Sequence, residues 1–135
     1  MESYSIQPIG LIRSELKTRE AAPLFYTEGA PPAVLELLPQ YAEALAHIRV
    51  GDEIIVITWF HRAQRDVLKV HPRGDPRNPL TGVFSTRSPD RPNPLGLHRV
   101  TVLAVSPHAL HIGPIEAIDQ TPVVDIKPVV SSQDF

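Results

Sequence analysis

The chain has 135 residues, of which 42% are hydrophobic and 21% charged, an ordinary composition for a globular protein. This length predicts one domain over residues 1–135. The net charge of -2 argues against a broadly basic nucleic-acid-binding surface, and the absence of cysteine excludes disulfides, thiolate metal ligands and a cysteine nucleophile.

No segment resembles a signal peptide or a membrane span. The longest apolar run, Ile54 to Phe60, is interrupted by Thr58 and is far shorter than the roughly 20 residues that cross a bilayer. We therefore expect a cytoplasmic protein that makes no membrane contact.

The first third of the chain predicts two strands and a helix. The β-branched run Ile6–Arg13 contains Pro8, which suits an edge or the start of a strand. A long loop follows over residues 14–32, and a loop of this length in a small domain is usually functional or mobile. Residues 33–38 form the second predicted strand, and Pro39 opens a short helix over residues 40–48.

The run Glu53–Phe60 predicts a buried strand at the centre of the core. It is apolar, rich in β-branched residues and of strand length, as expected for a strand that is covered on both faces. Such a strand delivers the polar residues that follow it, His61 and Arg62, to the rim of a sheet. Another strand is expected over residues 66–70, before a loop with several prolines.

The stretch from Gly82 to Leu103 predicts a stiff polar loop between two strands. Three prolines within residues 89–94 fix their own φ angles and restrict the residues before them. Such a loop presents its arginines and hydroxyls with little freedom left to lose on binding, although loop arginines are more often simply solvated. Gly96 permits an unusual backbone conformation or the close approach of a ligand.

The last third of the chain predicts short, closely spaced strands over residues 100–105, 109–112, 115–118 and 123–130. Many short strands with one helix indicate a mainly β barrel or sandwich. No glycine-rich dinucleotide loop and no Gly-x-Ser-x-Gly elbow is present. The six histidines lack His-Glu-x-x-His spacing and an accompanying carboxylate cluster, so we expect surface histidines and no metal site.

The turn Asp119-Gln120-Thr121-Pro122 is explained by turn chemistry alone, since aspartate commonly begins a tight turn. Together with two other stretches, however, it matches a known family. The central string Thr86-Arg87-Ser88-Pro89-Asp90-Arg91-Pro92-Asn93-Pro94-Leu95-Gly96-Leu97 closely resembles the central motif of the TsaA-like family, also called YaeB-like or TrmO-like. Residues 119–128 resemble its second motif, Asp-Gly-Thr-Pro-x-x-Asp-Ile-Lys-Pro, with Gln120 in place of the usual glycine, and residues 9–13 resemble its N-terminal strand.

This resemblance implies an S-adenosylmethionine-dependent methyltransferase built on a single-sheet β-barrel with one short helix and long proline-rich loops. The better-known members are homodimers that methylate the exocyclic nitrogen of a threonylcarbamoyl-modified adenosine beside the tRNA anticodon. The early loop departs from the family, which tends to have arginine and glutamine after the proline at position 23. By position, the residues expected to bind the cofactor are Pro23, Leu24, Phe25, His61, Arg62, Arg87, Leu97, Asp119, Gln120, Thr121 and Pro122.

The residue types suit this chemistry. Asp119 is a candidate acceptor for a ribose hydroxyl or an amino group, and Arg87 is a candidate partner for a carboxylate or phosphate. His61 and Asp125 are candidates, by residue type, to take the proton from the attacking nitrogen. Arg62, Arg73 and Arg91 are candidates to contact tRNA phosphates.

Two alternatives remain open at this stage. The chain ends at Phe135, so we expect it to lack the further C-terminal domain with which some family members bind tRNA. A non-catalytic module would bind S-adenosylmethionine without turnover on any RNA. An enzyme that methylates a small molecule would retain turnover but bind RNA weakly and without salt dependence.

Overall fold

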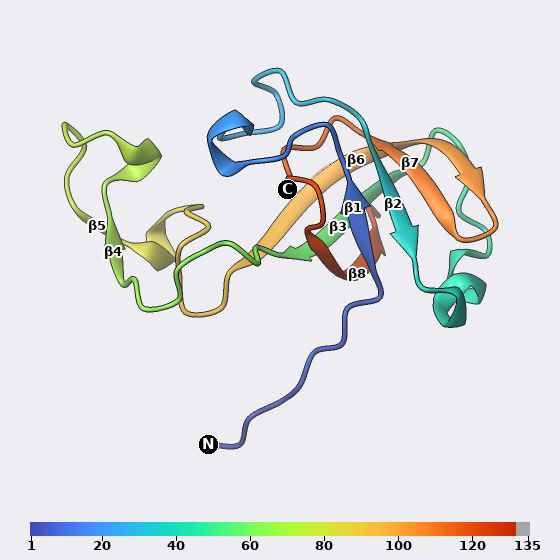
Figure 1. The fold of residues 1–135 in the computed structure, drawn as a ribbon, viewed down its shortest axis with the longest axis horizontal. Coiled ribbons are helices and arrows are strands. Elements are labelled where there is room, and N and C mark those ends of the chain that lie inside the picture. The colour runs from blue at the N-terminus through green and yellow to red at the C-terminus, as the bar shows by residue number, and fades with distance from the viewer. Residues whose placement is uncertain (132–135) are drawn as a thin grey trace.

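The computed structural model describes residues 1–131. Six strands form a closed antiparallel barrel in the order β1-β2-β7-β6-β3-β8 (Figure 1). The expectation of a mainly β, single-sheet barrel is confirmed. The strand bounds are β1 Gly10–Arg13, β2 Ala33–Leu37, β3 Glu53–Trp59, β6 Leu95–Ser106, β7 Ala109–Gly113 and β8 Pro122–Pro128.

Strand β1 closes the barrel because it pairs on both sides. Gly10 lies opposite Leu37 of β2 and opposite Val123 of β8. A Cβ atom at Gly10 would collide with the carbonyl oxygen of Glu36, so only glycine allows this approach of β1 to β2. Because every neighbouring pair is antiparallel, one end of the barrel holds the last residues of β1, β3 and β7 and the first residues of β2, β6 and β8. We call this end the barrel mouth.

The core fills the barrel with alternate side chains from each strand. In β2, for example, Ala33, Leu35 and Leu37 are buried while the residues between them are half-buried. Full burial of an aliphatic side chain contributes about 1.5–3 kcal/mol, so this inner layer supplies most of the driving force for folding. The fully buried members are Ile12, Leu35, Val56, Val102, Leu110, Ile112, Ile115 and Val123.

After residue 90, the structure differs most from the predicted strands at two places. Strand β6 begins at Leu95, five residues before the expected start, because β3 pairs with it from Trp59 opposite Leu95 to Glu53 opposite Thr101. This pairing outweighs the low strand propensity around Gly96. Residues 115–118 form no strand; instead Ile115 and Ala117 are buried against the core from the loop between β7 and β8.

The described residues contain only 3₁₀ helices, which are η1 Arg19–Ala21, η2 Pro39–Leu45, η3 Pro72–Gly74 and η4 Val83–Ser85. The helix expected over residues 40–48 is therefore η2, tighter and shorter than predicted. It ends before His47, whose φ of 76° is incompatible with continuation of a right-handed helix. Leu45 of η2 is buried against the barrel core.

The segment between β3 and β6 forms a lobe beside the barrel (Figure 1). Its only strands are the short pair β4, Lys69–Val70, and β5, Thr81–Gly82. The strand expected over residues 66–70 is thus reduced to its last two residues. Within residues 1–131, no helix has the length and apolar character needed to cross a membrane.

Candidate functional site

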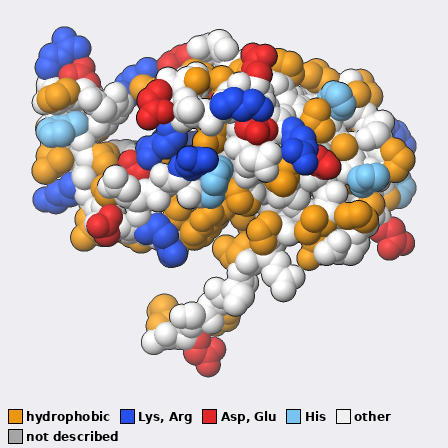
Figure 2. Space-filling view, in the orientation of Figure 1, with side chains coloured by type: hydrophobic (Ala, Val, Ile, Leu, Met, Phe, Trp, Pro, Cys, Tyr) orange, Lys and Arg blue, Asp and Glu red, His pale blue; other side chains and the backbone are white. Residues whose placement is uncertain are grey.

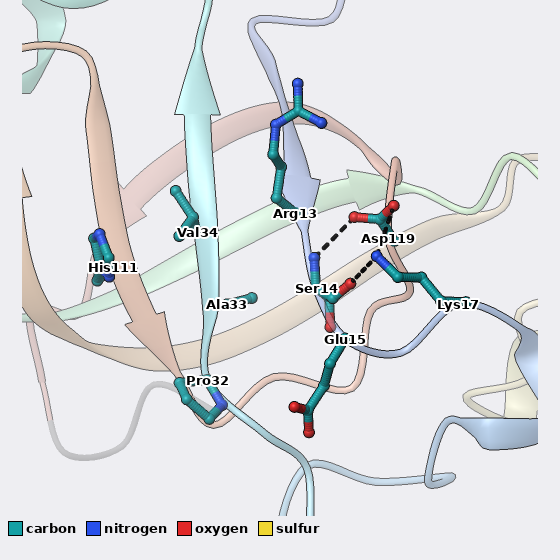
Figure 3. A pocket seen from close by; sticks show the side chains of 9 residues that line it. All are labelled: Arg13, Ser14, Glu15, Lys17, Pro32, Ala33, Val34, His111 and Asp119. Carbon is teal, nitrogen blue, oxygen red and sulfur yellow. Dashed lines mark hydrogen bonds and ion pairs between the residues drawn. The ribbon is translucent and has the colours of Figure 1, made fainter.

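Asp119 joins the loop between β7 and β8 to the chain that leaves β1. Its Oδ1 accepts a hydrogen bond from the Ser14 N–H over 2.9 Å, and its own N–H donates to the Leu16 carbonyl over 2.6 Å. The Lys17 ammonium lies 3.3 Å from Oδ2 and donates to the Ser14 carbonyl over 2.8 Å. Figure 3 shows the Asp119 and Lys17 side chains facing each other next to Ser14. Two segments far apart in sequence are thereby fixed together at the barrel mouth.

These contacts determine the charge of Asp119. The hydrogen bond from the Ser14 N–H is the main cause that lowers the pKa of the Asp119 carboxyl below its ordinary value, while partial burial acts in the opposite direction. The Gln120 amide and Lys17 lower this pKa further. Asp119 is therefore an ionised acceptor at neutral pH.

The turn after Asp119 is held by backbone bonds to β1. The Gln120 N–H donates to the Ile12 carbonyl over 2.7 Å, and the Ile12 N–H donates to the Thr121 carbonyl over 2.9 Å. Gln120 has a φ of 71°, the left-handed region that favours glycine. The turn thus keeps the conformation for which the motif usually has glycine, at the cost of strain in Gln120. Thr121 is buried and donates its hydroxyl to the Ile118 carbonyl over 2.7 Å, and Pro122 begins β8.

A second group of contacts joins the early loop to the central motif. The Arg19 guanidinium donates to both oxygens of Asp90, each over 3.2 Å, and also to the Arg62 carbonyl over 3.4 Å. Asp90 Oδ1 in addition accepts from the Gln64 N–H over 2.9 Å. The early loop, the segment after β3 and the central motif therefore meet beside the barrel mouth.

Arg91 serves the loop that contains it. Its guanidinium donates to the carbonyls of Ser88, Val83 and Thr86 over 2.8, 2.5 and 2.6 Å. These bonds use the Nε and Nη2 donors of the guanidinium. Arg91 therefore shapes the central motif, and its contact with RNA stays a prediction.

His61 and Arg62 lie immediately after β3, as predicted, and both are exposed. Partial burial, followed by the charge of Arg62, lowers the pKa of the His61 imidazole below its ordinary value of 6.5. His61 is therefore largely uncharged at pH 7 and able to accept a proton. Among the described residues, Arg62 forms no ion pair.

The remaining residues predicted to bind the cofactor offer apolar surface and one cation. Leu24 and Phe25 in the early loop are 60% and 44% exposed, and Leu97, on the outer side of β6, is 43% exposed. Pro23 is half-buried, and Arg87 of the central motif is exposed. Exposed leucine and phenylalanine side chains of this kind are suitable for packing against an aromatic base.

Asp125 lies apart from Asp119. It faces Ile57 across β8 and β3, pairs with Lys127 over 3.5 Å, and lines a hollow of about 640 Å³ with Tyr41 and other residues of η2. Asp119 instead lines a hollow of about 600 Å³ with Arg13, Lys17 and His111 (Figure 3). Asp119 and Asp125 therefore line different hollows, and His61 lines neither of them.

Several residues at the mouth were not predicted from the sequence. Ser14, Lys17 and Arg19 are ordinary loop residues whose partners are remote in sequence, so no local pattern marks them. His98 is different, because the expectation of surface histidines is wrong for this residue: it is 1% exposed inside the barrel. Its alternation with Gly96, Val100 and Val102 on the inner face would have revealed this, had β6 been predicted from Leu95. Among residues 1–131, no three histidine, aspartate or glutamate side chains are grouped to hold a metal.

Comparison with known proteins identifies the family. Residues 11–135 match the family model TrmO_N, described as the tRNA-methyltransferase O N-terminal domain. The chain belongs to the TrmO family. A probable S-adenosyl-L-methionine-binding protein of Methanocaldococcus jannaschii is 40% identical, over 92% of this chain and 90% of its own length. A probable S-adenosyl-L-methionine-binding protein of Pyrococcus horikoshii is 42% identical, over 93% of this chain and 82% of its own.

Solved TrmO structures share the fold. A crystal structure of TrmO from Pseudomonas aeruginosa has a TM-score of 0.78 and 32% identity over 98% of this chain, and another TrmO structure has a TM-score of 0.79 and 34% identity over 98%. The chain spans 59% and 60% of those two proteins. This protein therefore has the S-adenosylmethionine-binding methyltransferase fold of the TrmO family, and S-adenosylmethionine is its cofactor.

The residues at the barrel mouth suit this cofactor. Ionised Asp119 is an acceptor for a ribose hydroxyl or an ammonium group, and the cation of Arg62 suits a carboxylate. Exposed Leu24, Phe25 and Leu97 suit the faces of an adenine ring. The donor and acceptor set therefore matches the chemical groups of S-adenosylmethionine.

Proposed function

We propose that this protein transfers a methyl group from S-adenosylmethionine to the exocyclic nitrogen of a threonylcarbamoyl-modified adenosine next to the tRNA anticodon. The observation that carries the proposal is the meeting of the motifs at one end of the barrel. The second motif is fixed to the chain after β1 through Ser14 and Asp119, and the central motif is fixed to the early loop through Arg19 and Asp90. A tRNA-modifying activity would be cytoplasmic.

Positioning is the main contribution that such a protein can make. When bound, the cofactor supplies an electrophilic methyl group on a positively charged sulfur. In-line displacement gains most from holding the reacting atoms close and aligned, and effective molarities for well-oriented groups reach about 10⁵ M or more. The proline-rich central motif, held by Arg91, and the turn held by Asp119 are rigid supports for that purpose.

His61 is the better-placed proton acceptor of the two predicted from sequence. It lies at the barrel mouth with a lowered pKa, so its imidazole is unprotonated at neutral pH and able to accept the proton that the attacking nitrogen loses. Asp125 lines the other hollow and is paired with Lys127. We therefore assign proton acceptance to His61 and retain Asp125 only as the second candidate.

The charge distribution supports a small RNA footprint. Figure 2 shows basic side chains where the lobe meets the barrel, most of them beside acidic ones. Arg73 pairs with Glu28 over 2.9 Å and Arg77 with Asp75 over 2.7 Å, whereas Arg62 and Lys69 have no ion pair among the described residues. We propose that Arg62 and Lys69 contact phosphates, and that Arg73 does so only if its pair with Glu28 opens.

We further propose that the protein acts as a homodimer with the cofactor near the subunit interface. In support, Leu24, Phe25 and Leu97 leave apolar surface beside the mouth of the single chain. A second subunit would cover part of this surface and separate the cofactor from water. Sedimentation analysis with and without S-adenosylmethionine tests this assembly.

A methyl-transfer assay on two tRNA preparations tests the function. Transfer from labelled S-adenosylmethionine to tRNA that carries the threonylcarbamoyl group, and none to the same tRNA without it, is the expected result. Cofactor binding without transfer to either preparation would contradict it and favour a binding module, in line with the names of the archaeal relatives. Transfer to small-molecule acceptors alone would favour an enzyme that methylates a small molecule.

A further inference from the structure

A chain of hydrogen bonds runs through the barrel interior just below the mouth. The Thr58 hydroxyl lies 2.7 Å from His98 Nε2, and His98 Nδ1 lies 2.6 Å from Glu116 Oε1. Thr58 belongs to β3, His98 to β6 and Glu116 to the loop between β7 and β8. Thr58 and His98 are fully buried, and the Glu116 side chain is 18% exposed. We call these three residues the His98 network.

The direction of these bonds depends on the tautomer of the imidazole. No other hydrogen bond of the Thr58 hydroxyl is found among the described residues, so we expect this hydroxyl to donate to Nε2. With that direction, Nδ1–H donates to the Glu116 carboxylate. The network is thus one continuous chain from Thr58 through His98 to Glu116, with a single tautomer of the imidazole.

The His98 network makes the folded protein less stable than apolar side chains at the same positions would. Glu116 Oε2 is buried and has no hydrogen-bond partner among the described residues. A buried carboxylate oxygen without a donor is unfavourable, and apolar side chains of similar volume would fill the same space without this penalty. A role in stability alone is therefore a poor explanation for the network.

The surroundings of His98 connect the two parts of the candidate site. The Phe60 ring meets the His98 ring edge-on, with centroids 5.7 Å apart, and Phe60 directly precedes His61. On the other side, Glu116 is three residues before Asp119 in the loop that carries the second motif. Thr58 itself lies opposite Val123, the residue after Pro122. The imidazole therefore lies between the segment that carries His61 and the loop that carries Asp119.

Gly96 leaves room for this arrangement. A Cβ atom at this position would lie 2.5 Å from Phe60 Cζ, 2.5 Å from Thr58 Oγ1 and 2.8 Å from His98 Nε2. The glycine of the central motif thus admits the protein's own side chains, where the sequence suggested either an unusual backbone or a ligand. The central motif and the network are consequently one packing unit.

We propose that the His98 network is a positioning device that sets the His61 segment and the Asp119 loop relative to each other for cofactor binding. His98 and Glu116 act through the residues they hold, without touching the cofactor. The inference rests on the proposed placement of the cofactor at the barrel mouth, and it is independent of the RNA substrate.

The test compares cofactor affinity and stability in matched variants. Thr58→Val removes the hydroxyl and keeps the shape, Glu116→Gln removes the charge and keeps the size, and Thr58→Ser restores the hydroxyl. Val102→Ala, at a fully buried position toward the other end of β6, is the control for general destabilisation. All are measured by thermal unfolding and by calorimetric titration with S-adenosylmethionine.

We expect Thr58→Val and Glu116→Gln to weaken cofactor binding by about 3- to 30-fold, the range typical of residues that couple to a site without touching its ligand. Thr58→Ser should bind nearly as the wild type does. Val102→Ala should lower the melting temperature and leave the affinity unchanged. Equal affinity in all variants, with only the melting temperature changed, would overturn the proposal.

An independent readout covers the case in which Thr58→Val does not fold. Nitrogen NMR of labelled wild-type protein should show His98 protonated at Nδ1 and unprotonated at Nε2, and Glu116→Gln should alter this pattern. Protonation at Nε2 in the wild type would overturn the proposal. A wild type that binds cofactor but fails to methylate tRNA would contradict the proposed function and leave this inference intact.

Discussion

The Ser14 N–H donates to Asp119 Oδ1 over 2.9 Å, and this bond joins residues 105 positions apart in the sequence. It fixes the second motif against the end of β1 and, with Lys17, keeps the Asp119 carboxylate ionised. The carboxylate that we propose as a cofactor acceptor is thus held by the same contacts that fasten the loop.

Asp119→Asn should reduce the free energy of unfolding at neutral pH. It should also make this free energy depend less on pH in the acid range. Because the folded protein has a lowered pKa at Asp119, the contribution of this residue is fully present above the ordinary aspartate pKa of about 4 and is lost as pH falls through the folded value. Chemical denaturation between pH 7 and pH 2 measures this. Asp66→Asn, at an exposed aspartate, is the control. Identical pH dependence in wild type and Asp119→Asn would show that the contact contributes nothing.

Gln120→Gly should stabilise the protein by about 0.5–1 kcal/mol, because relief of the left-handed conformation outweighs the greater freedom of glycine in the unfolded chain. His47→Gly is a matched control, since His47 is exposed and has a φ of 76°. Both variants should raise the midpoint of urea unfolding. A decrease in the midpoint for Gln120→Gly would mean that the hydrogen bond from the Gln120 side chain to Asp119 stabilises the fold by more than the backbone strain destabilises it.

His61→Ala should lower the rate of methyl transfer at saturating cofactor by about 100-fold or more, the usual contribution of a general base. In the wild type, the acid limb of the rate profile should lie below pH 6.5, because burial and Arg62 lower the pKa of His61 and the unprotonated form is active. Arg62→Gln should move that limb part of the way back toward 6.5, since burial, the larger cause, remains. A limb that is unchanged in Arg62→Gln would exclude His61 as the titrating group.

Arg91→Lys should loosen the central motif, because a single ammonium nitrogen cannot replace the two guanidinium nitrogens, Nε and Nη2, that bond the three carbonyls in a fixed plane. Hydrogen exchange should rise in residues 83–91 while the barrel strands stay protected. In Arg91→Gln, which removes the charge, the salt dependence of RNA binding should not change, in contrast to Arg62→Gln, which should reduce it. A reduced salt dependence in Arg91→Gln would support a direct RNA contact of Arg91.

The sequence predicted the fold well where a strand is buried and contiguous. Glu53–Phe60 matches β3 to within one residue, because a β-branched apolar run of this length suits a strand in the core. The start of β6 was missed because Gly96 and His98 give no local strand signal, and the pairing with β3 that makes them a strand is tertiary. The helix over residues 40–48 was located correctly but is a 3₁₀ helix.

For the candidate site, the motifs pointed to loops that lie at the barrel mouth but not to the contacts that these loops make. Asp119 and Gln120 were predicted from the turn, whereas their fastening to Ser14 and Ile12 depends on how the barrel closes. The bonds from the Arg91 side chain to the backbone of its own loop were also missed, because no sequence pattern indicates such bonds. Glu116 was missed because residues 115–118 were predicted to form a strand, whereas they belong to the loop between β7 and β8.

An NMR titration of the labelled protein with S-adenosylmethionine tests directly whether the cofactor binds at the barrel mouth. Cofactor binding at the barrel mouth predicts that the amide signals of Ser14, Leu97 and residues 119–121 shift most, with saturation at one equivalent per chain. The signals of residues 44–48 and of Asp125, around the other hollow, should stay nearly unchanged. Large shifts confined to that second group, or no shift at either place, would contradict the account.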